Sequence, residues 1–182
     1  MLSDLRMAAD AGANFLTALG CLSYTETVGI FLPPLPGKET GKREEKYFYR
    51  CLFRFPSSTY MKQLDKALRD DSAKNGLYAL RNSMSHRYYP TLRRRTNGVV
   101  SFTSSMVAMH GVLKDLARGT SVDSPPIFID SEGRLAVVIR SYISELENAA
   151  RGFMDQTFEK KSPEFVEYAI KGSRYFFYDQ RD

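Results

Sequence analysis

Residues 77–89 read LYALRNSMSHRYY, and this stretch determines which fold the chain is expected to adopt. The residues that lead into it, 73–80, contain no proline and are good helix formers apart from Gly76. At about 3.6 residues per turn, the apolar residues of such a helix fall on one stripe and most of the polar and tyrosine side chains on a neighbouring stripe. The apolar stripe holds Leu77, Leu80 and Met84, and the neighbouring stripe holds Tyr78, Asn82, Ser85, His86 and Tyr89. The sequence therefore predicts a helix that ends near His86, with the first stripe in the core and the second available to bind a ligand.

Three polar side chains of this helix belong to the kinds that bind phosphate and move protons. Arg81 carries a permanent positive charge, Asn82 an amide, and His86 an imidazole that titrates near neutral pH. Arg81 precedes His86 by five residues, so its long side chain could bring the guanidinium beside the imidazole. These three residues are the candidate catalytic residues, and RNA is the suggested substrate. A histidine that merely closes a structural helix is the simpler alternative.

The pattern Arg81-Asn82-x3-His86 near the end of a helix resembles the signature of the HEPN superfamily, which comprises small helical ribonucleases and nucleotide-binding domains. With Tyr88 it becomes Arg-x4-His-x-Tyr, which is similar to the HepT toxin branch. In that branch a partner nucleotidyltransferase antitoxin can adenylylate the tyrosine, so Tyr88 is a candidate modification site. The resemblance covers eight residues. It implies a mainly α, up-and-down helical bundle and a metal-independent endoribonuclease, in the role of a toxin or defence component, with no cofactor.

Cleavage of RNA without a metal ion needs a base for the 2′-hydroxyl, an acid for the leaving 5′-oxygen, and positive charge near the transition state. One chain offers a single convincing histidine, His86, because His110 has no partner at a suitable spacing. A two-fold homodimer would place two copies of the motif in one cleft, and HEPN proteins usually dimerise in this way. His86 would then move the proton, Arg81 would hold the scissile phosphate, and Asn82 would orient the substrate or the imidazole.

Two other functions remain open. A non-catalytic HEPN-like module would use the same polar face to bind a nucleotide, a partner nucleotidyltransferase or another helix. It is favoured if Arg81 and His86 pair with internal groups instead of facing one shared cleft. A general RNA-binding domain would bind RNA in a salt-sensitive manner without needing His86. Its aromatic contacts would be Tyr47, Tyr49, Tyr88 and Tyr89.

Basic residues are concentrated around the same helix. The chain carries a net charge of +5, and residues 61–97 alone hold nine basic and three acidic side chains. A polyanion needs such counter-charge, although a solvated loop after a helix would look similar. The candidate RNA-binding residues are Arg87, Tyr88, Tyr89, Arg93, Arg94 and Arg95.

Length and composition predict one domain over residues 1–182, because 43% apolar residues can bury one substantial core. Cys21 and Cys51 lie outside any Cys-x-x-Cys pattern and are expected to be buried, reduced thiols without zinc or another metal. No apolar run has the length of a membrane span, and the first residues do not resemble a secretion signal, so a cytoplasmic protein without a membrane partner is expected. Phosphate-cradling glycine loops and nucleophile elbows are absent from the sequence.

Periodicity and turn residues predict the remaining elements. One long amphipathic helix is expected over 5–22, ended by the prolines at 33, 34 and 36 and followed by a charged connector over 37–45. Residues 47–55 could be a strand or a helix start, and a helix is expected from Ser57 or Ser58 to Arg69. An insertion at about 97–134 should contain strands near 99–103 and 126–130 and a helix over 106–118. A long last bundle helix over 137–158 and a short helix over 163–171 follow, and the aromatic cluster 175–178 is expected to dock on the core or on a dimer partner.

Overall fold

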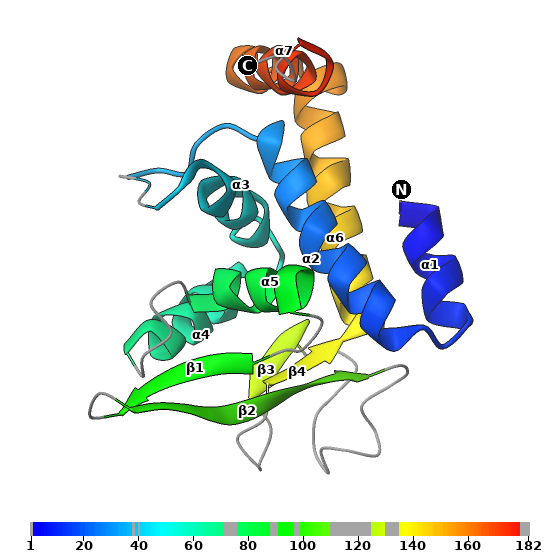
Figure 1. Ribbon diagram of the computed structural model, residues 1–182. Coiled ribbons are helices and arrows are strands. Elements are labelled where there is room, and N and C mark those ends of the chain that lie inside the picture. The colour runs from blue at the N-terminus through cyan, green and yellow to red at the C-terminus, as the bar shows by residue number, and fades with distance from the viewer. Residues whose placement is uncertain are drawn as a thin grey trace.

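Helices make up most of the structure, and its strands lie together in one small sheet (Figure 1). The computed structural model describes residues 2–37, 39, 41–70, 76–87, 91–96, 99–109, 125–129 and 135–178. The helices are α1 (Leu2–Asp10), α2 (Asn14–Ile30), α3 (Arg43–Leu52), α4 (Ser58–Asp70), α5 (Gly76–Arg87), α6 (Ile139–Met154) and α7 (Pro163–Tyr178), with a π-helical turn, η2 (Asp155–Glu159), after α6. The strands are β1 (Thr91–Thr96), β2 (Val99–Met109), β3 (Ile127–Ile129) and β4 (Leu135–Val138). A mainly α fold with a small β insertion between the motif helix and the last long bundle helix is thus confirmed.

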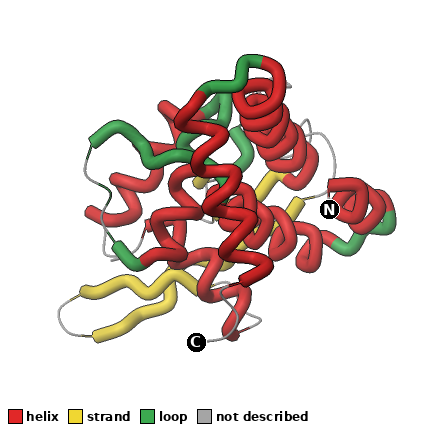
Figure 2. The backbone as a smooth tube through the Cα atoms, turned by 90° about the horizontal axis from the view of Figure 1, so that it is seen from above, coloured by secondary structure: helices red, strands yellow, loops and turns green. Residues whose placement is uncertain are grey.

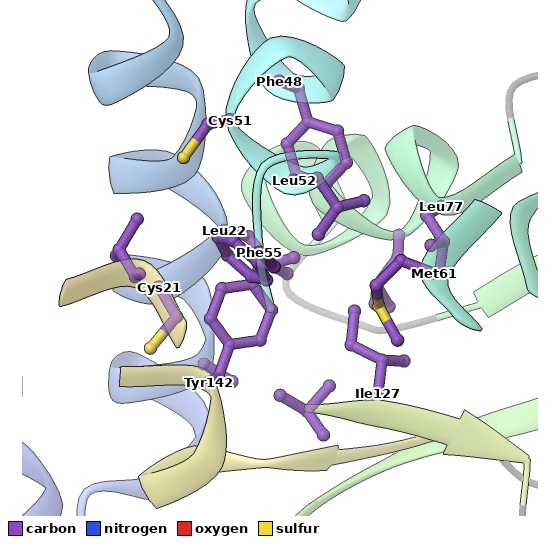
Figure 3. Packing of buried hydrophobic residues seen from close by; sticks show 14 of the residues in the cluster. Cys21, Leu22, Phe48, Cys51, Leu52, Phe55, Met61, Leu77, Ile127 and Tyr142 are labelled. Atoms are coloured by element: carbon purple, nitrogen blue, oxygen red, sulfur yellow. The ribbon is translucent and has the colours of Figure 1, made fainter. Parts of the chain in front are cut away.

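Helix α2 is the central element of the bundle. It contacts α1, α3, α5 and α6, and Figure 1 shows α2 and α6 side by side, with α1 on one side and α3 and α5 on the other. Its side chains meet those of the neighbouring helices and of the sheet in one core (Figure 3). Leu22 of α2, Leu52 of α3, Leu77 of α5, Ile127 of β3 and Tyr142 of α6 are all fully buried in this core. The apolar side chains of α2, α3, α5 and α6 therefore face a common centre.

The prediction of one long first helix is wrong, because residues 11–13 are not helical and separate α1 from α2. Gly12 adopts a positive φ of 73°, a conformation that glycine reaches without the steric cost of a side chain. Helix α1 then folds back so that the side chain of Leu5 lies against Gly20 of α2. Both helices bury apolar residues, which is why the apolar spacing continues across a break that periodicity alone does not reveal.

Two predicted helices are confirmed with modest changes, and one segment whose structure was left open is also a helix. Residues 47–55, for which strand and helix were both open, belong mainly to helix α3, which begins inside the predicted connector. Helix α4 matches the expected helix that starts at Ser57 or Ser58. Helix α5 ends at Arg87, one residue after His86, and buries Leu77, Leu80 and Met84 as expected. Tyr78 was assigned to the available stripe, but it is also buried because its ring packs 5.5 Å from that of Phe48 on α3.

The four strands form a mixed sheet in the order β1-β2-β4-β3. β1 pairs antiparallel with β2, β2 pairs parallel with β4, and β3 pairs antiparallel with β4. From above, the β1–β2 hairpin extends beyond the helices (Figure 2). The two expected strands correspond to β2 and β3, whereas β1 and β4 were missed and widen the insertion at both ends. Residues 106–109 belong to β2, so the helix expected over 106–118 is wrong there, and its remainder, with His110, lies outside the described residues.

Helix α7 is longer than expected and lies across the end of the bundle (Figure 1). Its Tyr175 ring meets Tyr47 of α3 edge to face at 6.1 Å and lies 4.9 Å from the guanidinium carbon of Arg43. The expected docking of the terminal aromatic cluster on its own chain is thus confirmed for Tyr175. The side chains of residues 176–178 lie outside the description.

The two cysteines are free and buried, as expected. Burial raises the pKa of the Cys21 thiol to about 12 and that of the Cys51 thiol further still, so both thiols stay protonated and unreactive at neutral pH. Among the described helices none combines the length and the apolar character needed to cross a membrane.

Candidate functional site on helix α5

The start of α5 is fixed by a buried carboxylate on α4. Asp65 accepts hydrogen bonds from the backbone N–H of Leu77 at 2.8 Å and from the hydroxyl of Tyr49 at 2.7 Å. Gly76 has a φ of 50°, and a Cβ there would lie 2.1 Å from an oxygen of Asp65. A glycine is therefore needed both for the backbone conformation and for the close approach of the carboxylate.

The same carboxylate belongs to a network that joins three helices. Arg69 donates to Asp65 at 2.8 Å and to Glu45 of α3 at 3.1 Å. The oxygen of Tyr49 in turn accepts the backbone N–H of Tyr78 at 3.2 Å. Burial and the negative charge of Asp65 raise the pKa of Tyr49 well above its usual value, so Tyr49 remains a neutral donor. This network holds the first turn of α5 against α3 and α4.

Arg81 lies at the middle of α5 and faces α2. Its Nε is 2.8 Å from an oxygen of Glu26, and only 20% and 14% of these two side chains are exposed. Within the described part of the chain neither atom has a well-aligned hydrogen bond, so the contact is an ion pair. Burial raises the pKa of Glu26, Arg81 opposes that shift, and Glu44 adds to it. The pair therefore holds a carboxylate that is easier to protonate than usual.

The guanidinium of Arg81 has two further neighbours on its own helix. One terminal nitrogen donates to the side-chain oxygen of Asn82 at 3.4 Å, and the guanidinium carbon lies 5.9 Å from the ring centre of Tyr78. The structure thus brings together two of the three candidate catalytic residues, Arg81 and Asn82. Because arginine has five N–H donors, these contacts leave donors that could reach a phosphate.

The other candidate residues are described only by their backbone or not at all. His86 and Arg87 form the end of α5, and five residues of helix place His86 about 7.5 Å along the axis from Arg81. Arg93, Arg94 and Arg95 lie in strand β1, paired with β2, and not in an open loop after the helix. Tyr88 and Tyr89 lie outside the described residues.

The aromatic residues proposed for base stacking do not form one exposed platform. Tyr49 is 7% exposed and donates its hydroxyl to Asp65, so it cannot stack on a base. Tyr47 packs against Tyr175. The general RNA-binding hypothesis is therefore wrong for Tyr49.

Glu26 is the residue of this site that the sequence interpretation missed. It lies 55 positions before Arg81, so no local spacing connects the two. A signal was present nevertheless, because Glu26 is the only charged residue of α2, a helix of 17 residues. A single carboxylate in a central helix of a bundle requires a partner when it is buried.

Comparison of the chain with protein-family models, with curated proteins and with solved structures finds no match. Function is therefore inferred from the residues of the site. Among the described residues no group of three or more histidine, cysteine, aspartate or glutamate side chains could hold a metal ion.

Proposed function

We propose that this chain is a metal-independent endoribonuclease of the HEPN type that acts as a homodimer, in the role of a toxin or defence component. The observation that supports the proposal is the position of Arg81. Its guanidinium is held beside Asn82 by Glu26, 20% of its side chain is exposed, and it belongs to the helix that also carries His86. A preorganised cation of this kind is suited to a scissile phosphate, because it costs little reorganisation when charge develops there.

The proposed roles follow from the chemistry of each group. Arg81 holds the phosphate through its terminal nitrogens, while Glu26 fixes the guanidinium from the Nε side. His86 takes the proton of the 2′-hydroxyl, and His86 of a second copy gives a proton to the leaving 5′-oxygen. Asn82 keeps the guanidinium in place and can accept or donate a hydrogen bond to the substrate.

The second candidate is a non-catalytic HEPN-like module that binds a nucleotide or a partner nucleotidyltransferase. The Arg81–Glu26 ion pair favours it, because an internal carboxylate partly cancels the charge that would otherwise attract a phosphate. In this case Tyr88 would be the acceptor of a nucleotidyl group from the partner.

The test compares RNA cleavage by the wild type and by Arg81→Ala and His86→Ala variants, in excess EDTA, on structured and unstructured RNA. Arg151→Ala is a matched control, since Arg151 is exposed on α6, and His110→Ala controls for loss of a histidine. Circular dichroism and the molar mass from light scattering verify that each variant keeps its fold and oligomeric state.

The proposal expects cleavage products with 2′,3′-cyclic phosphate ends from the wild type and both controls, and a loss of at least about 100-fold in the two site variants. A strict monomer at micromolar concentration would contradict the dimer mechanism. Absence of cleavage by every form, with fold and dimer intact, would support the second candidate instead.

A further inference from the structure

A cavity of about 460 Å³ lies between α3, α4 and the residues Leu35, Pro36 and Glu39, and its lining includes neither Arg81 nor Asn82. We propose that this cavity is a binding site for a small organic phosphate, a phosphate monoester with a flat apolar body. Its phosphate would lie between Lys46 and Lys62, and its body against Phe53 and Leu35. The volume falls within the range of small-ligand sites, roughly 300–1,000 Å³. The inference does not depend on the proposed ribonuclease activity.

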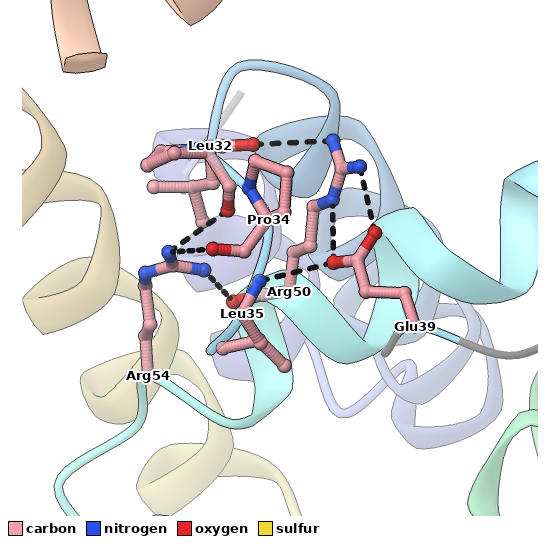
Figure 4. A network of polar contacts seen from close by, with 7 residues as sticks. Leu32, Pro34, Leu35, Glu39, Arg50 and Arg54 are labelled. Atoms are coloured by element: carbon pink, nitrogen blue, oxygen red, sulfur yellow. Dashed lines mark hydrogen bonds and ion pairs between the residues drawn. The ribbon is translucent and has the colours of Figure 1, made fainter. Parts of the chain in front are cut away.

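Two arginines of the α3 region bind residues that form or flank this part of the cavity wall (Figure 4). Arg50 donates to both oxygens of Glu39 at 2.9 and 2.8 Å and to the carbonyl oxygen of Leu32 at 3.3 Å. Arg54 donates to the carbonyl oxygen of Pro33 at 2.8 Å. The backbone N–H of Leu35 donates to Glu39 at 3.1 Å. These bonds keep the cavity open before any ligand arrives, which lowers the cost of binding.

The acidic groups of the cavity are already compensated. Burial alone would raise the pKa of Glu39, but the hydrogen bonds from Arg50 and Leu35 lower it, so this carboxylate stays ionised and paired. Asp65 is bound by Arg69, which also binds Glu45. Both carboxylates on the cavity wall are thus paired with arginine.

Two lysines that line the cavity do not take part in these ion pairs. Within the described part of the chain neither Lys46 nor Lys62 belongs to an ion pair, and both line the cavity with Arg69. The ammonium of Lys62 lies 5.6 Å from the ring centre of Phe53, on the face of that ring. Lys46 acts on Glu39 through its charge alone, which helps to lower the pKa of that carboxyl. Two ammonium groups without an ion pair in one concave site favour an anion with more than one charge, and a phosphate monoester carries nearly two at neutral pH.

The remaining lining of the cavity is largely apolar, and Phe53 is the aromatic residue there that keeps part of its surface exposed. Phe53 and Tyr49 stack with their ring centres 5.0 Å apart and an angle of 30° between the rings. Leu35 and Pro36 contribute to the same cavity from the segment after α2. Inorganic phosphate alone would leave this apolar lining uncovered, which is why an organic body is part of the proposal.

The cavity is linked to helix α5 through Asp65. That carboxylate lines the cavity and also accepts the backbone N–H of Leu77 in the first turn of α5. A ligand that orders the cavity wall should therefore also stabilise the start of α5, the helix that carries Arg81.

The test is isothermal titration calorimetry of the full chain with phenyl phosphate, adenosine 5′-monophosphate, phenol and inorganic phosphate, with amide NMR shifts to locate binding. At least one organic phosphate should bind at least tenfold more tightly than inorganic phosphate and phenol, and the shifts should centre on α3 and α4. The nucleotide and the phenyl ester distinguish a nucleotide site from a site for smaller phosphates.

Variants decide whether the two lysines hold the phosphate. Lys46→Gln/Lys62→Gln should weaken binding at least tenfold, whereas Lys66→Gln, an exposed lysine on α4 outside the cavity, should leave it unchanged. Arg81→Ala should also leave binding unchanged, so failure here is distinguishable from failure of the ribonuclease proposal. Equal affinity for inorganic phosphate and both organic phosphates would overturn the inference, as would unchanged binding in the double variant.

Discussion

Replacement of Asp65 by alanine should destabilise the fold more than the loss of one surface charge would suggest. The change removes the acceptor of the Leu77 N–H and of the Tyr49 hydroxyl, both buried, and one partner of Arg69. A buried donor without a partner costs about 1–3 kcal/mol. Arg69 keeps Glu45 and is 34% exposed, so its loss is smaller. The sum is about 4 kcal/mol, or a fall in Tm of roughly 8–16 °C for a chain of this size.

Urea denaturation followed by circular dichroism measures this change as a difference in the free energy of unfolding. Asp65→Asn keeps an oxygen that can accept the Leu77 N–H, so it should cost about half as much. Asp155→Ala is the control, because the side chain of Asp155 is 46% exposed and its ion pair with Lys160 lies at the surface. That control should change stability by no more than about 0.5 kcal/mol. A loss of less than about 1 kcal/mol in Asp65→Ala would refute the view that Asp65 anchors α5.

Three further outcomes are expected. Gly29→Ala should destabilise the protein by about 3 kcal/mol in the same urea assay, because a Cβ there would lie 1.7 Å from the backbone oxygen of Tyr47. Gly152→Ala meets nothing within 4 Å on helix α6 and should stabilise it by about 0.5–1 kcal/mol; equal effects of the two glycine changes would contradict the packing of α2 on α3. Burial raises the pKa of Glu26 above its ordinary 4.5, so its protonation favours the folded state, and this contribution is present below pH 4.5 and lost as the pH rises through the raised pKa. The free energy of unfolding of the wild type relative to Glu26→Gln should therefore increase as the pH falls from about 7 to about 4, and a constant difference would show that Glu26 does not titrate in this way.

The fold was predictable where a helix buries a regular apolar stripe. Leu77, Leu80 and Met84 predicted α5 because helical spacing is a local property. The sheet was harder to predict, because three successive arginines, Arg93–Arg95, stand in β1 in place of an alternating apolar pattern and the strand gains its hydrogen bonds from β2. β4 was missed for another reason, since Val138 runs into α6 without a turn residue and the apolar pattern continues across the boundary.

The residues of the site that lie on α5 could be predicted from the sequence, but their partner on a second helix could not. Spacing placed Arg81, Asn82 and His86 on a single helix, and the contact of Arg81 with Asn82 agrees with that expectation. The partner of Arg81 comes from α2, 55 positions earlier, and depends on how α2 and α5 pack. Even so, Glu26 is the only charged residue of a central helix, and a buried carboxylate must pair or take up a proton. A lone charge in a helix whose other residues are uncharged is therefore a reason to search for a partner of opposite sign on the other bundle helices. In the structure that partner is Arg81, whereas Arg50 and Arg69 pair with Glu39 and Asp65.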